Sequence, residues 1–226
     1  MKPGAGGLNL TNRSGAGFGR PLGSVALAGV PAMLFYLLHD VVGATLYPGY
    51  DAFRQAVSDL TSADAPSRIV AGGLSNVYGT LAVLSSVAVA ILMQQSDNAR
   101  LRRGVGWFAV MNLVSNVGYA LFPLSTSGYA GTFSDIMHLY VVTASVVLTS
   151  IASLVLIALG GRRGTRRDKL LGVLALVALA MMLGGAVLSN AGPASLFGLF
   201  ERFSTYSAVT FTAVLGVYGH ALSRRD

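Results

Sequence analysis

Residues 170–189 read LLGVLALVALAMMLGGAVLS, a run in which the final serine is the sole polar side chain. A helix crosses the hydrocarbon core of a bilayer with about 20 apolar residues. A helix on the surface of a soluble protein needs only an apolar stripe, whereas this run is apolar all round. The segment is therefore predicted to span a membrane, where it faces lipid or serves as scaffold.

Five further stretches have comparable length and apolar content: 22–47, 67–94, 104–124, 136–160 and 199–222. Of the 226 residues, 53% are hydrophobic and 11% are charged, against about 25% charged residues in soluble domains. We predict an all-α integral membrane protein, a six-transmembrane-helix bundle over residues 21–223. A flexible cytoplasmic tail, residues 1–20, precedes it, and no cleavable signal peptide is expected.

The Lys and Arg residues predict the orientation, because cytoplasmic loops of membrane proteins carry an excess of them. The N-terminal tail, two alternate loops and the C-terminus hold most of them: Lys2, Arg13, Arg20, Arg100, Arg102, Arg103, Arg162, Arg163, Arg166, Arg167, Lys169, Arg224 and Arg225. The three other connections hold only Arg54, Arg68 and Arg202. Both termini are therefore predicted to be cytoplasmic, in a multi-pass protein of the plasma (inner) membrane.

The net charge of +7 has the same explanation, since the arginines lie at the ends of apolar runs. Nothing resembles a basic helix or a base-stacking surface, so membrane lipids are expected as partners and nucleic acid is not. The chain has no cysteine, which excludes disulfides and thiolate metal sites.

Polar residues within the spans concentrate toward the outer side of the membrane. In the first span, Tyr36, Asp40, Gly43 and Tyr47 share one helical face, with His39 beside them. The other spans bring further polar residues to a similar height: Asn76, Asn116, Tyr119, Asp135, His138, Glu201 and Arg202. Ionisable groups near lipid usually face the bundle interior or a water-filled cavity. We therefore predict an outward-open polar pocket.

The first outer connection is expected to cover that pocket. It reads YPGYDAFRQAVSDLTSADAPSR (residues 47–68), and its part 48–65 is predicted to lie in the interface as a lid. Pro48-Gly49 would make the turn into it. Asp51 and Arg54 form an i, i+3 pair, and four apolar residues give a short helix one apolar side: Ala52, Phe53, Val57 and Leu60.

Paired carboxylates in different surroundings can divide acid and base roles, which suits an intramembrane cyclase or hydrolase acting on a lipid or isoprenoid. The predicted catalytic residues are Asp40 as the protonated acid, Asp135 and His138 as the base or water-positioning pair, and Glu201. The predicted substrate-binding residues are His39, Tyr47, Asp51, Arg54, Asn76, Asn116, Tyr119 and Arg202.

Other interpretations of the same residues stay open. Interfacial Tyr, Asp and Arg are common as belts and helix caps without any chemistry. Asp135 would then cap the fourth span, and Glu201–Arg202 would be a solvated helix end. The protein could instead bind or transport a small solute or a lipid, or be a non-catalytic accessory protein with Phe53, Arg54 and Asp59 as partner contacts. No internal repeat supports transport.

No cofactor is expected. Only His39 and His138 lie on the outer side, with His220 at the opposite end, so a three-histidine zinc site cannot form. Two histidines with Asp40 or Asp135 remain geometrically compatible with zinc.

Four motifs occur in an order that resembles one family: residues 47–68, ALFPLS (120–125), DIMHLYVV (135–142) and GLFERFSTYS (198–207). The chain is similar, from about Phe35 to the end of the sixth span, to the six-span bacterial and archaeal family called domain of unknown function 998. The resemblance implies a six-helix bundle but brings no activity and no assigned residue.

Overall fold

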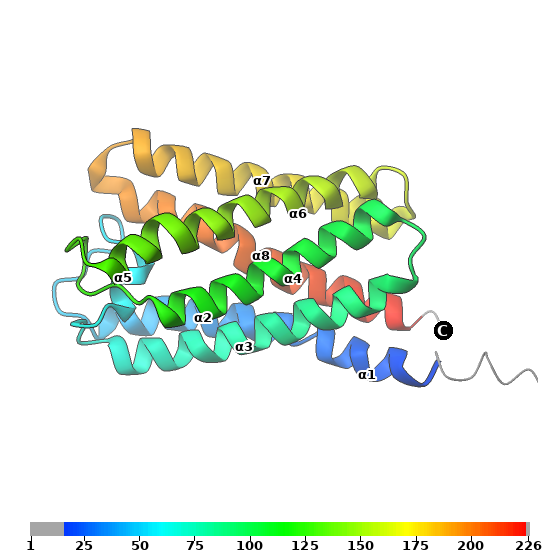
Figure 1. Ribbon diagram of the computed structural model, residues 1–226, viewed down its shortest axis with the longest axis horizontal. Coiled ribbons are helices and arrows are strands. Elements are labelled where there is room, and N and C mark those ends of the chain that lie inside the picture. Colours follow the sequence, from blue (N-terminus) through cyan, green and yellow to red (C-terminus); the bar gives the residue numbers. More distant parts are fainter. Residues whose placement is uncertain (1–15, 225–226) are drawn as a thin grey trace, which may run out of the picture.

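The computed structural model describes residues 16–224, with side chains from residue 19 onward. This part of the chain is helical and contains no strand. The α-helices are α1 (Ala16–Ala26), α2 (Gly29–Thr45), α3 (Arg68–Leu92), α4 (Ala99–Leu121), α5 (Phe133–Ile136), α6 (Thr143–Gly161), α7 (Arg166–Ala191) and α8 (Phe197–Ser223). Three short 3-10 helices, η2 (Val57–Thr61), η3 (Met93–Gln95) and η5 (Ala194–Leu196), and a π-helix, η4 (Met137–Val142), complete them. The long helices lie side by side along the longest axis (Figure 1).

Four helical stretches of the described chain are long and apolar enough to cross a membrane: Gly19–Thr45, Arg68–Gln95, Phe133–Gly161 and Arg166–Ala191. These stretches, and the absence of strands from the described chain, confirm the prediction of an all-α membrane protein. The helices α4 and α8 have 23 and 27 residues. Asn112 and Asn116 lower the apolar content of α4, and hydroxyl residues and His220 lower that of α8.

The first apolar stretch bends between α1 and α2. Proline lacks a backbone N–H, so Pro31 cannot donate to the carbonyl of Leu27, and Val30 donates to that carbonyl instead at 3.0 Å. Ser85 of α3 donates to the carbonyl of Ala26 at 2.6 Å. A Cβ on Gly29 would lie 2.5 Å from the carbonyl oxygen of Thr212, so only glycine fits where the bend meets α8. Because α1 begins at Ala16, helix starts within the predicted tail 1–20; residues 1–15 lie outside the described part.

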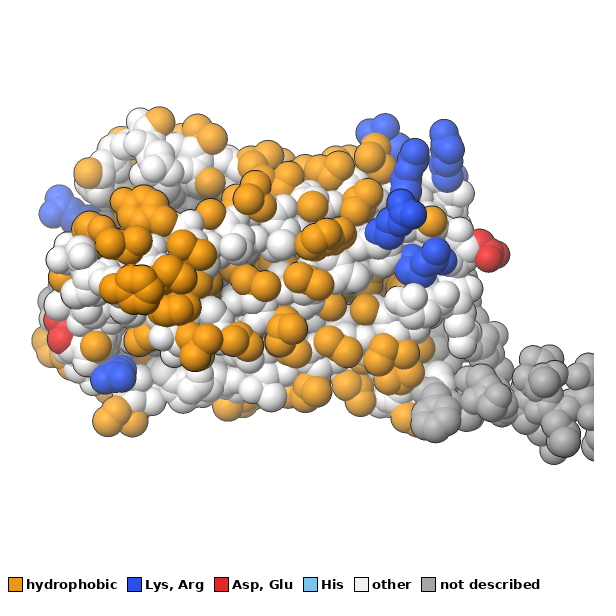
Figure 2. Space-filling view, in the orientation of Figure 1, with side chains coloured by type: hydrophobic (Ala, Val, Ile, Leu, Met, Phe, Trp, Pro, Cys, Tyr) orange, Lys and Arg blue, Asp and Glu red, His pale blue; other side chains and the backbone are white. Residues whose placement is uncertain are grey.

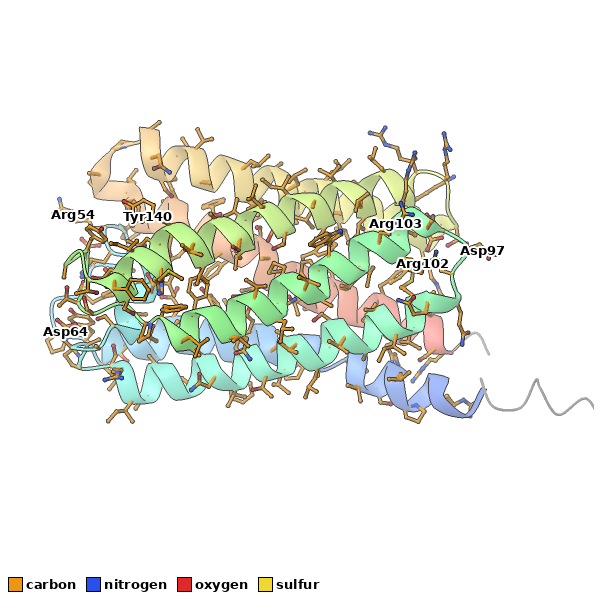
Figure 3. The ribbon with its side chains drawn as sticks, viewed as in Figure 1. Arg54, Asp64, Asp97, Arg102, Arg103 and Tyr140 are labelled. Carbon is orange, nitrogen blue, oxygen red and sulfur yellow. The ribbon has the colours of Figure 1, made fainter. Side chains whose placement is uncertain are left out.

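The bundle has two chemically different ends. The arginine-rich end consists of the loops 96–98 and 162–165 with the adjoining helix ends, and the other end carries the loops 46–67, 122–132 and 192–196. Figure 3 shows Arg102 and Arg103 at the first end with Asp97, and Arg54 and Asp64 at the second. Hydrophobic side chains cover the face between them (Figure 2).

The apolar core lies in the half nearer the arginine-rich end. Phe108 of α4 and Phe211 of α8 meet edge to face with ring centroids 5.2 Å apart, and both are fully buried. Leu154 and Ile157 of α6 pack in the same cluster and are 0% exposed. On the outside, α7 exposes Leu170, Val173, Val187 and other apolar side chains, as expected for a helix that faces lipid.

Candidate functional site

The connection between α2 and α3, residues 46–67, folds over the end of the bundle and is called the cap segment below. Gly49 has φ +79°, the left-handed conformation that the predicted Pro48-Gly49 turn requires. The predicted short helix is instead a turn followed by η2. Val57 and Leu60 face inward at 2% and 0% exposure, whereas Phe53 is 58% exposed.

Other loops of the same end hold the cap segment in place. Ala63 donates its backbone N–H to the carbonyl of Leu124 at 2.8 Å, and the N–H of Gly128 donates to the Asp59 carboxylate at 3.1 Å. The N–H of Leu199 donates to the carbonyl of Phe53 at 3.2 Å. The cap segment is therefore a packed layer of the fold.

Beneath the cap segment, Asp40 of α2 and Arg202 of α8 form a buried ion pair. Nε and Nη2 of Arg202 donate to the two carboxylate oxygens of Asp40, each at 2.8 Å. The two residues are 5% and 8% exposed. This planar two-point contact is the strong form of an arginine–carboxylate pair. The alternative interpretation of Arg202 as a solvated helix end is wrong.

Arg202 also joins α8 to the cap segment. Its Nη1 donates to the carbonyls of Ala52, Gln55 and Gly198, at 2.6, 3.1 and 3.0 Å. A Cβ on Gly198 would lie 2.2 Å from the Gln55 oxygen, so the absence of a side chain there lets the cap segment approach α8.

Two tyrosines complete this network. Tyr206, one turn after Arg202, donates its hydroxyl to Asp40. Tyr50 accepts from Nη2 of Arg202 at 2.7 Å and donates to the carbonyl of Ala56 at 2.7 Å. Burial raises the pKa of the Tyr50 phenol above its ordinary value, so it stays neutral beside Arg202. Every polar atom of the Asp40–Arg202 pair has a partner within the protein.

Glu201 differs from Asp40 in having an unused oxygen. Its Oε2 accepts the backbone N–H of Val57 in the cap segment at 2.9 Å. Its Oε1 makes no hydrogen bond within residues 16–224, and the side chain is half-buried, so this oxygen is not sealed inside the bundle.

His39 is a second group with unused hydrogen-bonding capacity. The side chain is 3% exposed, and neither ring nitrogen has a partner in the described chain. Its ring meets the edge of Tyr36 at 5.4 Å, and Tyr36 in turn meets Tyr78 at 4.8 Å and Tyr206 at 6.0 Å. Buried polar groups are normally paired, so an unpaired imidazole needs an explanation.

Asp135 and the Nδ1 atom of His138 form hydrogen bonds with neighbouring loop residues. Asp135 forms a capping box with Thr132 and accepts from the backbone N–H and the hydroxyl of Ser125 at 2.8 and 2.7 Å. The ring Nδ1 of His138 bonds to the carbonyl oxygen of Phe122 at 2.7 Å. The alternative interpretation of Asp135 as a helix cap is confirmed. The ring Nε2 of His138 makes no hydrogen bond within the described residues, so the base role predicted for His138 stays a prediction.

Several predicted lining residues do not face the Asp40–Arg202 pair. Asn76 is exposed on the outside of α3, which contradicts its predicted place in the pocket. Asp51 and Arg54 form the expected pair, at 3.7 Å, but on the surface of the cap segment, so neither residue lines a buried pocket. The prediction for Asn76 used only height along the membrane normal, and height does not determine which face of the helix a residue occupies.

The remaining predicted residues contribute packing. Tyr47 lies against Tyr50, with ring centroids 5.7 Å apart. Asn116 of α4 packs on Gly79 of α3, where an added Cβ would meet its Oδ1 at 2.0 Å. Tyr119 bonds to the hydroxyl of Thr143 at 3.1 Å and packs on the His138 ring at 4.6 Å.

Between Gly19 and Arg224, no three His, Asp or Glu side chains gather closely enough to hold a metal ion. The site with two histidines and a carboxylate, which the sequence left open for zinc, is therefore not formed by these residues.

The family model for "Protein of unknown function (DUF998)" matches residues 29–218, which is most of the chain and includes both partners of the ion pair. The chain belongs to the DUF998 family. No curated protein and no solved structure matches it. The DUF998 assignment thus agrees with the resemblance of the four motifs, and the match leaves α1 outside.

Sequence reasoning missed two members of the network around Asp40 and Arg202, namely Tyr50 and Tyr206. A signal for Tyr206 was present, since it follows Arg202 by four residues and therefore lies on the same face of α8. Tyr50 gave no such signal, because its position depends on the path of the cap segment.

Proposed function

We propose that this protein is a six-span, N-in/C-in protein of the inner membrane. Its site beneath the cap segment would act on the polar or reactive end of a lipid or isoprenoid by acid–base chemistry. The orientation is supported by the Lys/Arg distribution, since the arginine-rich loops share one end of the bundle. On that basis the cap segment lies on the outer side.

The chemical part of the proposal depends on one observation: unused hydrogen-bonding capacity beside the fully paired Asp40 and Arg202. Asp40 and Arg202 satisfy each other, while Glu201 Oε1 and the ring nitrogens of His39 have no partner in the described chain. A group that exchanges protons with a substrate must have a free atom to do so. The role of acid therefore passes from Asp40 to Glu201.

The aromatic surroundings favour a cyclase over a hydrolase. Glu201 would give its proton to an epoxide oxygen or an alkene carbon, and an internal double bond would attack the resulting cation. Loss of a proton from a neighbouring carbon to the Glu201 carboxylate would close the cycle and restore the acid. Aromatic faces stabilise cations, and Tyr36 forms an edge-to-face cluster with Tyr78 and Tyr206 in this part of the bundle.

Glu201→Gln tests this role, because the amide keeps an oxygen that can accept from Val57 N–H but cannot donate a carboxylic proton. Purified protein would be incubated with a bacterial polar lipid extract containing geranylgeraniol and its terminal epoxide, followed by mass spectrometry. A product made by the wild type should fall at least 100-fold in this variant, the lower range for a lost general acid.

Asp51→Asn is the matched control, since it removes an exposed carboxylate from the cap segment and should leave turnover unchanged. Turnover by Glu201→Gln at the wild-type rate would remove Glu201 from the mechanism. A wild type that leaves every probe unchanged would favour the second candidate.

The second candidate is an accessory membrane protein, favoured by the surface of the cap segment. Phe53 is 58% exposed, and the side chain of the adjacent Arg54 is 67% exposed. An aromatic residue beside an arginine is a common partner contact. If this candidate holds, Phe53→Ala with Arg54→Ala should abolish co-purification of a partner without unfolding the bundle.

A further inference from the structure

A second site, separate from the cap segment, is suggested by two hollows at and near the arginine-rich end. One, of about 320 Å³, lies between the start of α4 and the end of α6 and is lined by Arg100 and Arg163. The other, also of about 320 Å³, lies on α4 and is lined by Arg103, Gly106, Trp107 and Val110. Arg100, Arg103, Trp107 and Val110 follow helical spacing, so the two hollows lie along one face of α4.

The arginines that line the two hollows have unpaired guanidinium groups in the described chain. Arg100, Arg103 and Arg163 make no ion pair and no side-chain hydrogen bond within residues 16–224. Their neighbours are different, because Arg102 donates to the carbonyl of Ser96 at 2.7 Å and Arg167 to that of Ala221 at 2.8 Å.

The floor of the first hollow is fixed, since the Asn98 amide donates to the carbonyl of Gly160 at 3.0 Å and joins α4 to α6. Asp97 lines the same hollow and offsets part of its positive charge. The first N–H groups of α4 also lie here and add to the attraction for an anion.

The second hollow is apolar apart from Arg103. Nothing lies within 4 Å of a Cβ built on Gly106, so this position is open between Trp107 and Val110, which are 44% and 42% exposed. A tryptophan at this level is typical of the boundary between headgroups and acyl chains. Cationic and apolar surfaces thus follow each other along the helix axis.

We propose that this face of α4 binds one anionic phospholipid. Its phosphate would lie among Arg100, Arg103 and Arg163, and one acyl chain would run along Gly106 toward Val110. Basic hollows between spanning helices are suited to anionic headgroups. The site does not depend on chemistry at Glu201, because it lies at the opposite end of the bundle.

The test uses purified protein in neutral detergent, with phosphatidylglycerol and phosphatidylcholine as probes and native mass spectrometry as the readout. Arg100→Gln with Arg163→Gln should weaken phosphatidylglycerol binding about thirty-fold, at the free energy expected for two arginines near a lipid headgroup. Arg166→Gln with Lys169→Gln removes the same charge from the same end, outside the hollows, and should change binding less than threefold.

Gly106→Leu tests the acyl-chain part without changing any charge. The leucine fills the open position, so lipid binding should fall at least tenfold while the unfolding temperature stays within a few degrees of the wild type. Equal loss in the two charge variants, equal binding of phosphatidylcholine, or unchanged binding by Gly106→Leu would each overturn the proposal.

Discussion

The half of the bundle nearer the arginine-rich end and the half beneath the cap segment are stabilised by different means. The first is filled by apolar side chains such as Phe108, Phe211 and Leu154. The second is organised by the Asp40–Arg202 pair and its hydrogen bonds to the cap segment. An apolar core tolerates small losses gradually, whereas a buried ion pair fails when one partner is removed. The two halves should therefore respond differently to substitution.

The largest effect is expected for Arg202→Met, which leaves Asp40 as an unpaired buried charge. Removing one partner of a buried ion pair costs about 3–5 kcal/mol. Denaturant unfolding in detergent micelles measures the loss. Adding Asp40→Leu to the same chain should restore part of the stability, because no isolated charge is left; a double variant less stable than Arg202→Met contradicts this account.

Leu154→Ala should cost about 3 kcal/mol by leaving a cavity in the apolar core, with the cap segment intact. Leu154 is 0% exposed, and Leu148 of the same helix is 66% exposed. Leu148→Ala is therefore the matched control and should be close to neutral. Hydrogen exchange of residues 46–67 should be unchanged in both variants. Faster exchange there in Leu154→Ala would show that the two halves are coupled.

Thr132→Ala should have a smaller effect of about 1 kcal/mol, since it removes the side-chain half of the capping box of α5. Hydrogen exchange should become faster in residues 122–135 alone. Loosening of the cap segment as well would mean that Asp135 supports the second half more widely than its contacts indicate.

The smallest effect is expected for Arg54→Met. Its ion pair with Asp51 is exposed, and such pairs contribute about 0–1 kcal/mol. The same replacement of arginine by methionine should thus barely change the free energy of unfolding in the same denaturant experiment. A loss comparable to that of Arg202→Met would remove the distinction between the buried and the exposed arginine.

Four of the predicted spans match helices that are long and apolar enough to cross a membrane, because bilayer thickness sets the length of a span and hydropathy its position. The helical stripe of Asp40 correctly predicted an interior position, and Arg202 was correctly placed at a similar height, where it pairs with Asp40. Asn76 was placed wrongly because its face on α3 depends on the rotation of that helix against its neighbours. The π-helix Met137–Val142 left no pattern in the sequence, since one additional residue in a turn does not change the hydropathy.

The positions of Asp40 and Arg202 in the chain constrain biogenesis. They are 162 residues apart, one in the first long apolar stretch and the other in the last helix. During synthesis the carboxylate enters the bilayer long before its guanidinium partner exists. A chain that stops before α8 therefore carries an acid without its charge partner, which is costly within a bilayer. Synthesis of α8 is thus the step that supplies the charge partner of Asp40.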